Sequence, residues 1–292
     1  MPQAVWTTLI SCADLQALRK DAGRHSVLID CSFDLADPAA GRAAYHQSHL
    51  PGAFYLHLDN ELSGEKTGRN GRHPLPDPDA LTARLRALGV NDDTQVVVYD
   101  AQGSMYAARA WWLLRWIGHP AVAVLDGGKQ AWVAAGLPLE SGTTPEPEAH
   151  AGGHLTRRPS LVGTVDADTL MANLQSPSLQ VVDARAPDRF RGENETLDPV
   201  GGHIPGAVNR CFKDNLQPDG RFKPAETLRG EFGGVLGATP AERAVMQCGS
   251  GVTACHNLLA LEVAGLSGAA LYPGSWSEWC ADPARPVATG ER

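Results

Sequence analysis

Residues 243–265, RAVMQCGSGVTACHNLLALEVAG, decide the fold. A short apolar run ends just before Cys248 and predicts a buried strand. After a tight loop, the chain places Ala254 and Leu258 on one face of a helix, and Gly265 is a suitable residue to end that helix. A strand, a loop and a helix in this order form the repeating unit of parallel α/β sheets.

The chain contains this pattern twice, at an offset of about 150 residues. The matching passages are 27–30 (VLID) and 181–183 (VVD), 49–53 (HLPGA) and 203–207 (HIPGA), 95–100 (QVVVYD) and 243–248 (RAVMQC), and 125–128 (LDGG) and 272–275 (YPGS). So long an offset indicates a duplicated domain and not a solenoid. The copies differ most clearly where the first has Asp100 and the second has Cys248.

Short apolar strands alternate with helical stretches, such as 107–117 and 254–264, in both halves. We therefore predict an α/β protein of two tandem domains, each a doubly wound, mostly parallel sheet flanked by helices. Residues 140–159 are rich in Pro, Gly, Thr and charge, which is typical of a linker. The predicted limits are 1–142 for the first domain, 143–160 for the linker and 161–292 for the second domain.

The composition limits the classes of partner. The 292 residues carry a net charge of -8, the acidic residues are scattered, and Lys and Arg form no stripe, so we expect no nucleic acid partner. No run of about 18 apolar residues occurs, and Met1 to Ile10 lacks a basic segment followed by an apolar core. We therefore expect a cytoplasmic protein without a membrane partner.

The six cysteines are too sparse for a disulfide-stapled domain, and we expect free thiols. They are Cys12, Cys31, Cys211, Cys248, Cys255 and Cys280. They form no CxxC pair and no His spacing of structural zinc, so we expect no metal. Cysteine chemistry then belongs to a single residue.

The loop after the second-half strand is where a doubly wound sheet places its ligand. Glycines let the loop curl so that N–H groups and the helix N-terminus face an anion. The expected binding residues are Gly249, Gly251, Val252 and Thr253. A Cys248 thiolate in such a cradle has a lowered pKa and can carry a sulfur as a persulfide. Alternatively, Cys248 is only a small buried side chain in an ordinary turn.

A cysteine phosphatase is the competing enzyme class, because it also holds a thiolate at a strand-to-helix turn. Such enzymes need an arginine six positions after the cysteine to hold the phosphoryl oxygens. The sixth residue after Cys248 is Ala254. The sequence therefore argues against a phosphatase.

The loop 248–255 (CGSGVTAC) resembles the active-site loop of 3-mercaptopyruvate sulfurtransferases, and the doubled HIPGA and LDGG or YPGS patterns resemble the tandem rhodanese fold. The resemblance covers about Val5 to Asp282. It implies a non-catalytic first domain, in agreement with Asp100, and a catalytic second domain with Cys248. Thiosulfate-specific rhodaneses carry basic residues directly after the cysteine, whereas this loop has Gly249 and Ser250.

The resemblance also implies a catalytic set similar to that of serine proteases, at Ser250, His73 and Asp59. When Cys248 takes the sulfur, the three-carbon fragment leaves as an enolate, and a hydroxyl polarised by an imidazole can protonate it. Each residue also has an ordinary explanation. Ser250 and His73 can be loop residues, and Asp59 can cap a helix or belong to a turn.

Arg189 matches the family's carboxylate-binding arginine and an arginine that rhodaneses use for thiosulfate; a planar guanidinium suits two-point capture of an anion. Nine positions later, 3-mercaptopyruvate enzymes usually have a second such arginine, but this chain has Asp198. Arg191 and Lys213 are candidate replacements. Tyr106 resembles a first-domain residue that faces the cleft in relatives. Arg185 is expected to be a structural partner of a nearby carboxylate.

The resemblance implies a sulfurtransferase that takes sulfur from 3-mercaptopyruvate, releases pyruvate and passes the sulfur to cyanide, a small thiol or thioredoxin. It implies no cofactor, because the protein thiol is the carrier. Two alternatives stay open: thiosulfate as the preferred donor, and a non-catalytic rhodanese-like module for binding or sulfur relay. A retained Cys248 in a glycine-rich loop argues against the second.

Overall fold

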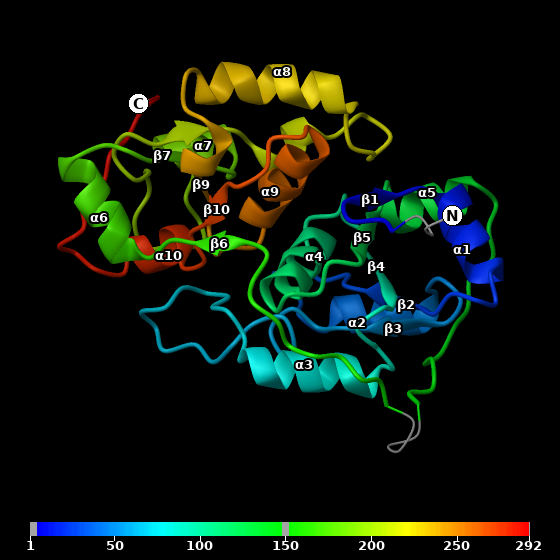
Figure 1. Ribbon diagram of the computed structural model, residues 1–292. Coiled ribbons are helices and arrows are strands. Elements are labelled where there is room, and N and C mark those ends of the chain that lie inside the picture. The colour runs from blue at the N-terminus through cyan, green and yellow to red at the C-terminus, as the bar shows by residue number, and fades with distance from the viewer. Residues whose placement is uncertain (1–4, 148–151, 292) are drawn as a thin grey trace. The chain divides into compact units, whose positions relative to one another are not determined.

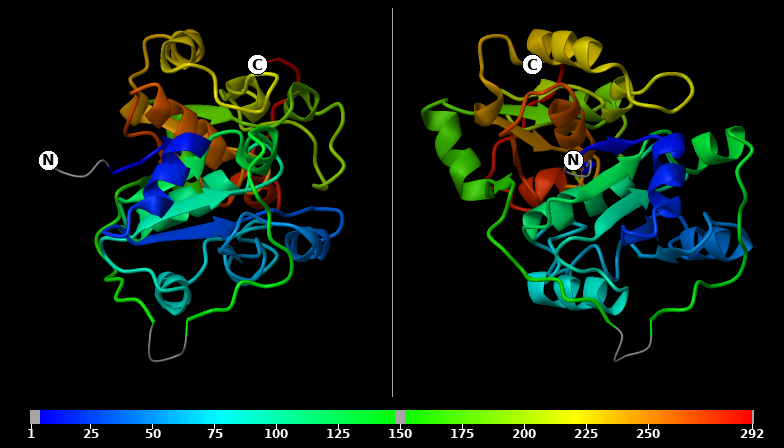
Figure 2. Two further views of the ribbon diagram at one scale, coloured as in Figure 1. Left: turned by 90° about the vertical axis from the view of Figure 1, so that its right-hand side faces the viewer. Right: turned by 45° about the vertical axis from the view of Figure 1, so that its right-hand side comes forward.

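The computed structural model describes residues 5–147 and 152–291. They form two five-stranded sheets, each with helices on both sides (Figures 1 and 2). Among the described residues, neighbouring strands within each sheet run parallel. The predicted α/β class with two doubly wound sheets is confirmed.

The first sheet contains β1 (Leu9–Ile10), β2 (Ser26–Asp30), β3 (Ala53–Tyr55), β4 (Gln95–Tyr99) and β5 (Val122–Leu125). Its strand order is β1-β5-β4-β2-β3. The helices of this half are α1 (Cys12–Lys20), α2 (Ala40–Gln47), α3 (Pro78–Ala87), α4 (Ala107–Trp116) and α5 (Gly128–Ala134). The predicted helix at 107–117 is thus confirmed to within one residue.

The second sheet repeats this order as β6-β10-β9-β7-β8. Its strands are β6 (Gly163–Thr164), β7 (Gln180–Asp183), β8 (Val208–Asn209), β9 (Ala244–Gln247) and β10 (Ala270–Leu271). The α-helices are α6 (Ala167–Gln175), α7 (Pro187–Arg191), α8 (Ala225–Leu236), α9 (Ala254–Val263) and α10 (Ser275–Trp279), and two short 3-10 helices are η1 (Phe212–Asn215) and η2 (Ala241–Arg243). The same strand order in both halves is the structural counterpart of the sequence repeat.

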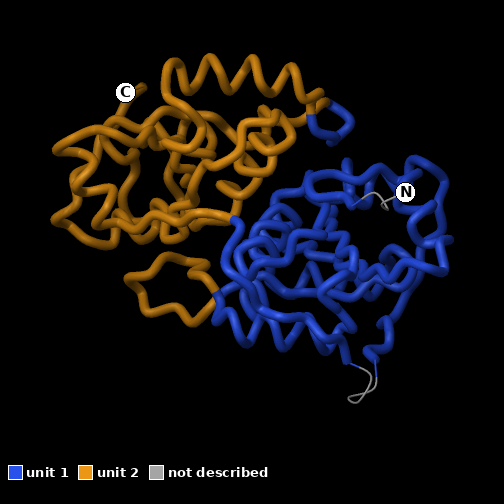
Figure 3. Tube along the Cα trace, viewed as in Figure 1, with its two compact units in different colours: residues 1–63, 76–161, 218–222 blue, residues 64–75, 162–217, 223–292 orange. Residues whose placement is uncertain are grey.

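The chain divides into two compact units, each of which includes a short segment from the other half of the sequence (Figure 3). Unit 1 is Met1–Ser63, Pro76–Leu161 and Pro218–Phe222, and unit 2 is Gly64–Leu75, Val162–Gln217 and Lys223–Arg292. Residues 64–75 thus belong to unit 2, although they precede the linker in sequence. The predicted domain limits stay a prediction.

Each unit has its own apolar core. In unit 1, Val97 and Tyr99 of β4 pack in one cluster with Trp132. In unit 2, Val245 of β9 packs in another cluster with Trp279. Trp132 and Trp279 are the tryptophans that the repeat makes equivalent, and burying such large side chains stabilises each core.

Helix α9 differs from the amphipathic helix that its sequence suggests. Ala254 and Leu258 are buried as expected, but so is every residue between Ala254 and Leu261. The helix packs on β9 and β10 and is also contacted by α8 and η1. It is therefore a core helix, and its position is fixed on several sides. Gly265 follows it in the left-handed conformation, with a φ of 71°.

In the described ranges, no helix combines the length and apolar character needed to span a bilayer. All six cysteines are unpaired in the structure.

Candidate active site

The cysteine loop follows β9 directly, at the carboxyl end of the strand. Cys248 is the first residue after β9, and α9 begins at Ala254. Two backbone hydrogen bonds tie the loop to the start of α10: Trp276 N donates to the Cys248 carbonyl (2.9 Å) and Ser277 N to the Gly249 carbonyl (3.0 Å). The loop therefore lies where parallel sheets place their ligands.

Both the sulfur and the backbone N–H of Cys248 have a hydrogen-bond partner. The Ser250 N–H points at its Sγ at 3.5 Å, and its own N–H donates to the Ser275 hydroxyl at 3.1 Å. The Ser275 hydroxyl in turn donates to the Tyr272 carbonyl at 2.9 Å. Ser275 has a φ of 53°, a left-handed conformation that costs a non-glycine residue about 1 kcal/mol. Such strain persists only where the surrounding structure fixes it, and here it accompanies the hydrogen bond between the Ser275 hydroxyl and the Cys248 N–H.

The other loop residues shape the turn into α9. Gly251 has a φ of 76°, and a Cβ there would lie 2.3 Å from the Pro273 carbonyl oxygen, so only glycine fits. Val252 is buried, and Thr253 is half-buried at the first turn of α9. The Cys255 thiol donates to the Gly251 carbonyl at 3.3 Å inside the helix, as expected for a structural cysteine.

His73 and Ser250 lie side by side, although 177 residues separate them in sequence. The distance between His73 Nδ1 and Ser250 Oγ is 2.8 Å, and both side chains are buried. Both residues belong to unit 2, because His73 is in the segment 64–75. The arrangement lets an imidazole polarise a hydroxyl two residues after the cysteine.

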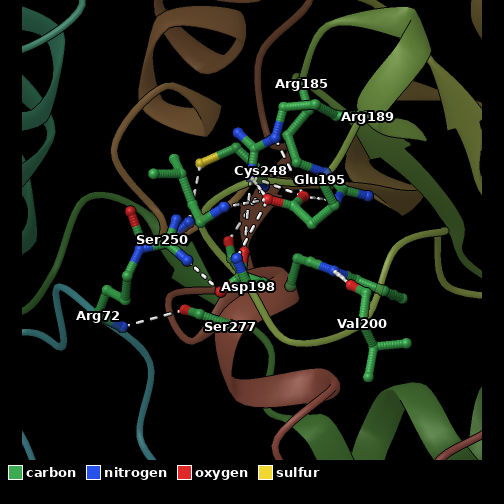
Figure 4. Close-up of polar contacts among 12 residues, drawn as sticks. Arg72, Arg185, Arg189, Glu195, Asp198, Val200, Cys248, Ser250 and Ser277 are labelled. Atoms are coloured by element: carbon green, nitrogen blue, oxygen red, sulfur yellow. Dashed lines mark hydrogen bonds and ion pairs between the residues drawn. The ribbon is translucent and has the colours of Figure 1, made fainter. Parts of the chain in front are cut away.

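Arg189 lies in a buried network of ion pairs beside the cysteine loop (Figure 4). Its Nε and Nη2 donate to the Glu195 carboxylate at 2.8–3.0 Å, and its Nη2 is 3.5 Å from Asp198 Oδ2. Asp198 Oδ1 pairs with the Nη1 of Arg72. Burial raises the pKa of Glu195, but N–H donors and the Arg189 guanidinium outweigh burial and hold this pKa below its usual range. Both carboxylates therefore stabilise arginines here.

Arg185 is a structural residue, in agreement with the sequence-based expectation. Its guanidinium donates to both Asp183 oxygens at 2.6–3.1 Å and to the Gly202 carbonyl at 2.6 Å. It also lies over the ring of Trp276, 4.7 Å from the ring centroid.

Arg191 takes no part in these contacts. Arg191 donates to Glu193 at 2.8–2.9 Å and lines a different hollow with Pro187 and other residues. Asp59 and Tyr106 belong to unit 1, so their roles in the site stay predictions.

Sequence reasoning missed Arg72 and Ser275. Arg72 directly precedes His73, and its position next to this candidate residue was the signal that could have identified it. Ser275 replaces the second glycine of the LDGG turn, at the position of Gly128, and an exchange of glycine for serine at a tight turn was the signal there.

Comparison with known proteins identifies the fold family. The model of the rhodanese-like domain matches residues 11–135 and 166–282, one copy in each half. The chain belongs to the rhodanese family. As the sequence predicted, this rhodanese has two tandem rhodanese-like domains and is a sulfurtransferase enzyme.

Its relatives carry two kinds of name. This rhodanese is 48% identical to a probable 3-mercaptopyruvate sulfurtransferase of Pseudomonas aeruginosa over 97% of this chain and 100% of that protein. It is 39% identical to a putative thiosulfate sulfurtransferase of Mycobacterium tuberculosis over 99% of each chain. The crystal structure of SseA from Escherichia coli aligns with a TM-score of 0.78 and 29% identity, over 93% of this chain and 99% of that one.

Proposed function

We propose that this rhodanese takes a sulfur atom from 3-mercaptopyruvate, releases pyruvate and passes the sulfur to a thiol or to cyanide through a persulfide on Cys248. The observation that carries the proposal is the 2.8 Å contact between His73 and Ser250, two residues after Cys248. Removing sulfur from a carbon chain leaves a carbanion that needs a proton, whereas thiosulfate needs none. The 48% identical relative is named for the same donor.

In the first half-reaction, the Cys248 thiolate attacks the substrate sulfur. A sulfur–sulfur bond forms, the carbon–sulfur bond breaks, and its electron pair leaves on the enolate of pyruvate. The Ser250 hydroxyl donates a proton to this enolate, and His73 replaces that proton, with Asp59 as the acid that orients the histidine. In the second half-reaction, an acceptor such as cyanide, a small thiol or thioredoxin attacks the outer sulfur, and Cys248 leaves as a thiolate.

Donor binding is assigned to the loop and to nearby cations. Arg189 is the proposed carboxylate ligand, because its planar guanidinium lies beside the cysteine loop. The further proposed binding residues are Gly249, Gly251, Val252, Thr253, Arg191 and Tyr106. We also propose the domain limits 1–142 and 161–292, with residues 143–160 as the linker, and a cytoplasmic location.

Thiosulfate is the second candidate donor, because one relative is named for it and the arginines beside the loop suit any small anion. The ratio of kcat/KM for the two donors decides between them. We expect 3-mercaptopyruvate to be preferred, and Ser250→Ala to lower its kcat while leaving thiosulfate turnover within about threefold, since only the former needs the proton.

The direct test is incubation with each donor, followed by intact and peptide mass spectrometry. We expect an increase of about 32 Da on Cys248 and release of pyruvate from 3-mercaptopyruvate. Cys248→Ser is expected to lose both signals. Pyruvate release by Cys248→Ser at the wild-type rate would falsify the proposed function.

A further inference from the structure

The segment 64–75 brings His73 to the cysteine loop within unit 2. A proton relay between His73 and Ser250 depends on their 2.8 Å contact, because protons are transferred over hydrogen-bond distances. Side chains keep such contacts only when the residues that support them hold the geometry to within about 0.5 Å. The group that fixes the backbone of this segment therefore bears on the proposed reaction.

The hydroxyl of Ser277 binds this segment at the residue before His73. Arg72 N donates to Ser277 Oγ at 3.0 Å, although 205 residues separate the two in sequence (Figure 4). The adjoining backbone is packed closely as well, because a Cβ added to Gly71 would lie 2.7 Å from the Gly274 carbonyl oxygen. Ser277 Oγ donates to that same carbonyl at 3.3 Å. The hydroxyl is thus both an acceptor and a donor, which fixes its orientation.

The same residue also binds the cysteine loop. The Ser277 N–H donates to the carbonyl of Gly249, next to the nucleophile, at 3.0 Å. Ser277 belongs to α10, and the tryptophans of this helix, Trp276 and Trp279, are completely buried in the core of unit 2. Ser277 therefore connects segment 64–75 through its side chain, and the cysteine loop through its backbone, to one helix that is anchored in the core.

The equivalent residue of the first copy has a different partner. The repeat places Gln130 opposite Ser277, and Ala101 opposite Gly249. Gln130 Nε2 donates to the Ala101 carbonyl, so this side chain binds its own loop. In the second copy the Ser277 backbone N–H makes the corresponding bond, and the hydroxyl binds Arg72. The exchange of Gln for Ser thus accompanies the copy that has the nucleophile.

We propose that Ser277 is a positioning residue for proton delivery, which holds the backbone of Arg72 and thereby keeps the His73 imidazole against Ser250. The inference rests on the proposed function, because it names a residue on which the proton step of that reaction depends. Ser277 is not a catalytic residue, since its hydroxyl is bonded to two backbone groups. Loss of this hydroxyl should slow the proton step more than it weakens donor binding.

Steady-state kinetics test the positioning role. In Ser277→Ala, we expect kcat for 3-mercaptopyruvate to fall about tenfold and KM to stay within about threefold, because a misplacement of about 1 Å costs up to about a hundredfold in rate. Thiosulfate turnover should stay within about threefold, since thiosulfate needs no proton. An unchanged kcat for 3-mercaptopyruvate, or an equal fall with both donors, overturns the proposal.

Two further variants serve as controls. Ser277→Thr keeps a hydroxyl and should recover most of the rate that Ser277→Ala loses. Ser267→Ala removes a hydroxyl from an exposed position of unit 2 and should keep the wild-type kcat. A rate in Ser277→Thr as low as in Ser277→Ala would show that the hydroxyl is not the group responsible, and overturns the proposal.

A second background separates positioning from a general loss of structure. In Ser250→Ala the relay is already broken, so the addition of Ser277→Ala should lower kcat no further. A merely structural role would lower kcat by the same factor in both backgrounds, and that result contradicts the positioning role.

Nuclear magnetic resonance of the full-length protein separates this inference from the proposed function. With isotope-labelled histidine, the ring signals of His73 report its contact with Ser250 without turnover, and His73→Gln identifies them. We expect Ser277→Ala to shift or broaden these signals, and Ser277→Thr and Ser267→Ala to leave them in place. Unmoved signals in Ser277→Ala overturn the role of Ser277, even if the wild-type protein releases pyruvate. Moved signals, when the wild-type protein releases no pyruvate, overturn the proposed function alone.

Discussion

The two loops that the duplication makes equivalent, 100–107 and 248–255, hold different groups. In the first loop, the Asp100 carboxylate accepts four backbone N–H groups, from Gln102, Ser104, Tyr106 and Ala107, at 2.8–2.9 Å. In the second loop, the same position is Cys248, with the Ser250 N–H at 3.5 Å from its sulfur. The first loop thus contains a carboxyl group that four backbone donors fix as part of the fold; burial raises the pKa of Asp100, and these N–H groups oppose the rise. The second has a thiol at this place, the group that we propose carries the sulfur.

The turns that support the two loops also differ, because one has a glycine where the other has a serine. Gly128 comes so close to the first loop that a Cβ would lie 2.4 Å from the Asp100 carbonyl oxygen. Its counterpart Ser275 has a similar φ but carries a side chain, and that side chain binds the N–H of Cys248. Each copy therefore contains one strained non-glycine residue, at different places: Ser275 in the turn that holds the Cys248 N–H, and Ser104, with a φ of 69°, inside the first loop itself.

The largest effect is expected when Cys248 is replaced by aspartate, the residue at the same position of the first loop. In Cys248→Asp, we expect sulfur transfer to fall by at least about 10⁴-fold, because a carboxylate cannot carry sulfur. The chain should still unfold cooperatively, since the loop donors bind a carboxylate in the other copy. Turnover assays and urea unfolding measure the two effects. Cys12→Ser, a thiol change in unit 1, should keep wild-type rates, and persistent transfer in Cys248→Asp would contradict the comparison.

Removing the Asp100 carboxyl group tests the first loop. Asp100→Ala leaves four buried N–H groups without their carboxylate, and we expect the free energy of unfolding to fall by roughly 3–5 kcal/mol. Urea unfolding measures this change. Asp34→Ala is the matched control, because its carboxylate accepts one N–H on the surface, and it should cost less than about 1 kcal/mol. A loss in Asp100→Ala no larger than in the control would show that the carboxylate is not structural.

The support from Ser275 predicts a smaller effect. Ser275→Ala keeps the strained backbone but leaves the Cys248 N–H without its acceptor, so stability should fall by about 1–2 kcal/mol and the transfer rate about tenfold. Ser275→Gly relieves the strain and should recover part of the stability but not the rate. Unfolding and single-turnover measurements on both variants separate strain from positioning. Equal rates in wild type and Ser275→Ala would remove the positioning role.

The smallest expected effect is on pH dependence. The pKa of Glu195 is held below its ordinary value, so its stabilising contribution is present above the unfolded pKa of about 4.3 and is lost as the pH falls through the lower folded value. The free energy of unfolding should therefore fall more steeply below about pH 4.3 in wild type than in Glu195→Gln. Urea unfolding between about pH 3 and 7 measures both slopes. Parallel slopes would show that Glu195 is not the group responsible.

Local sequence predicted the elements on both sides of Cys248 well, for a physical reason. The strand before Cys248 and the helix after it are encoded by apolar runs and by Gly265, all of which act over one or two turns of the chain. The duplication supported these predictions, because most of the predicted elements occur in both halves of the sequence. Resemblance supplied His73 as the partner of Ser250, and their 2.8 Å contact agrees with it.

The sequence alone determined the duplicated α/β fold and the position of Cys248, since both follow from patterns between near neighbours. Only the tertiary structure decided that Arg72 reaches Asp198 across 126 residues and lies over Gly249 beside Arg189. No local pattern marks such a contact, because it depends on segment 64–75 joining unit 2. Asp198, an acidic residue at a position where an arginine was expected, thereby forms an ion pair with an arginine from the other half of the chain.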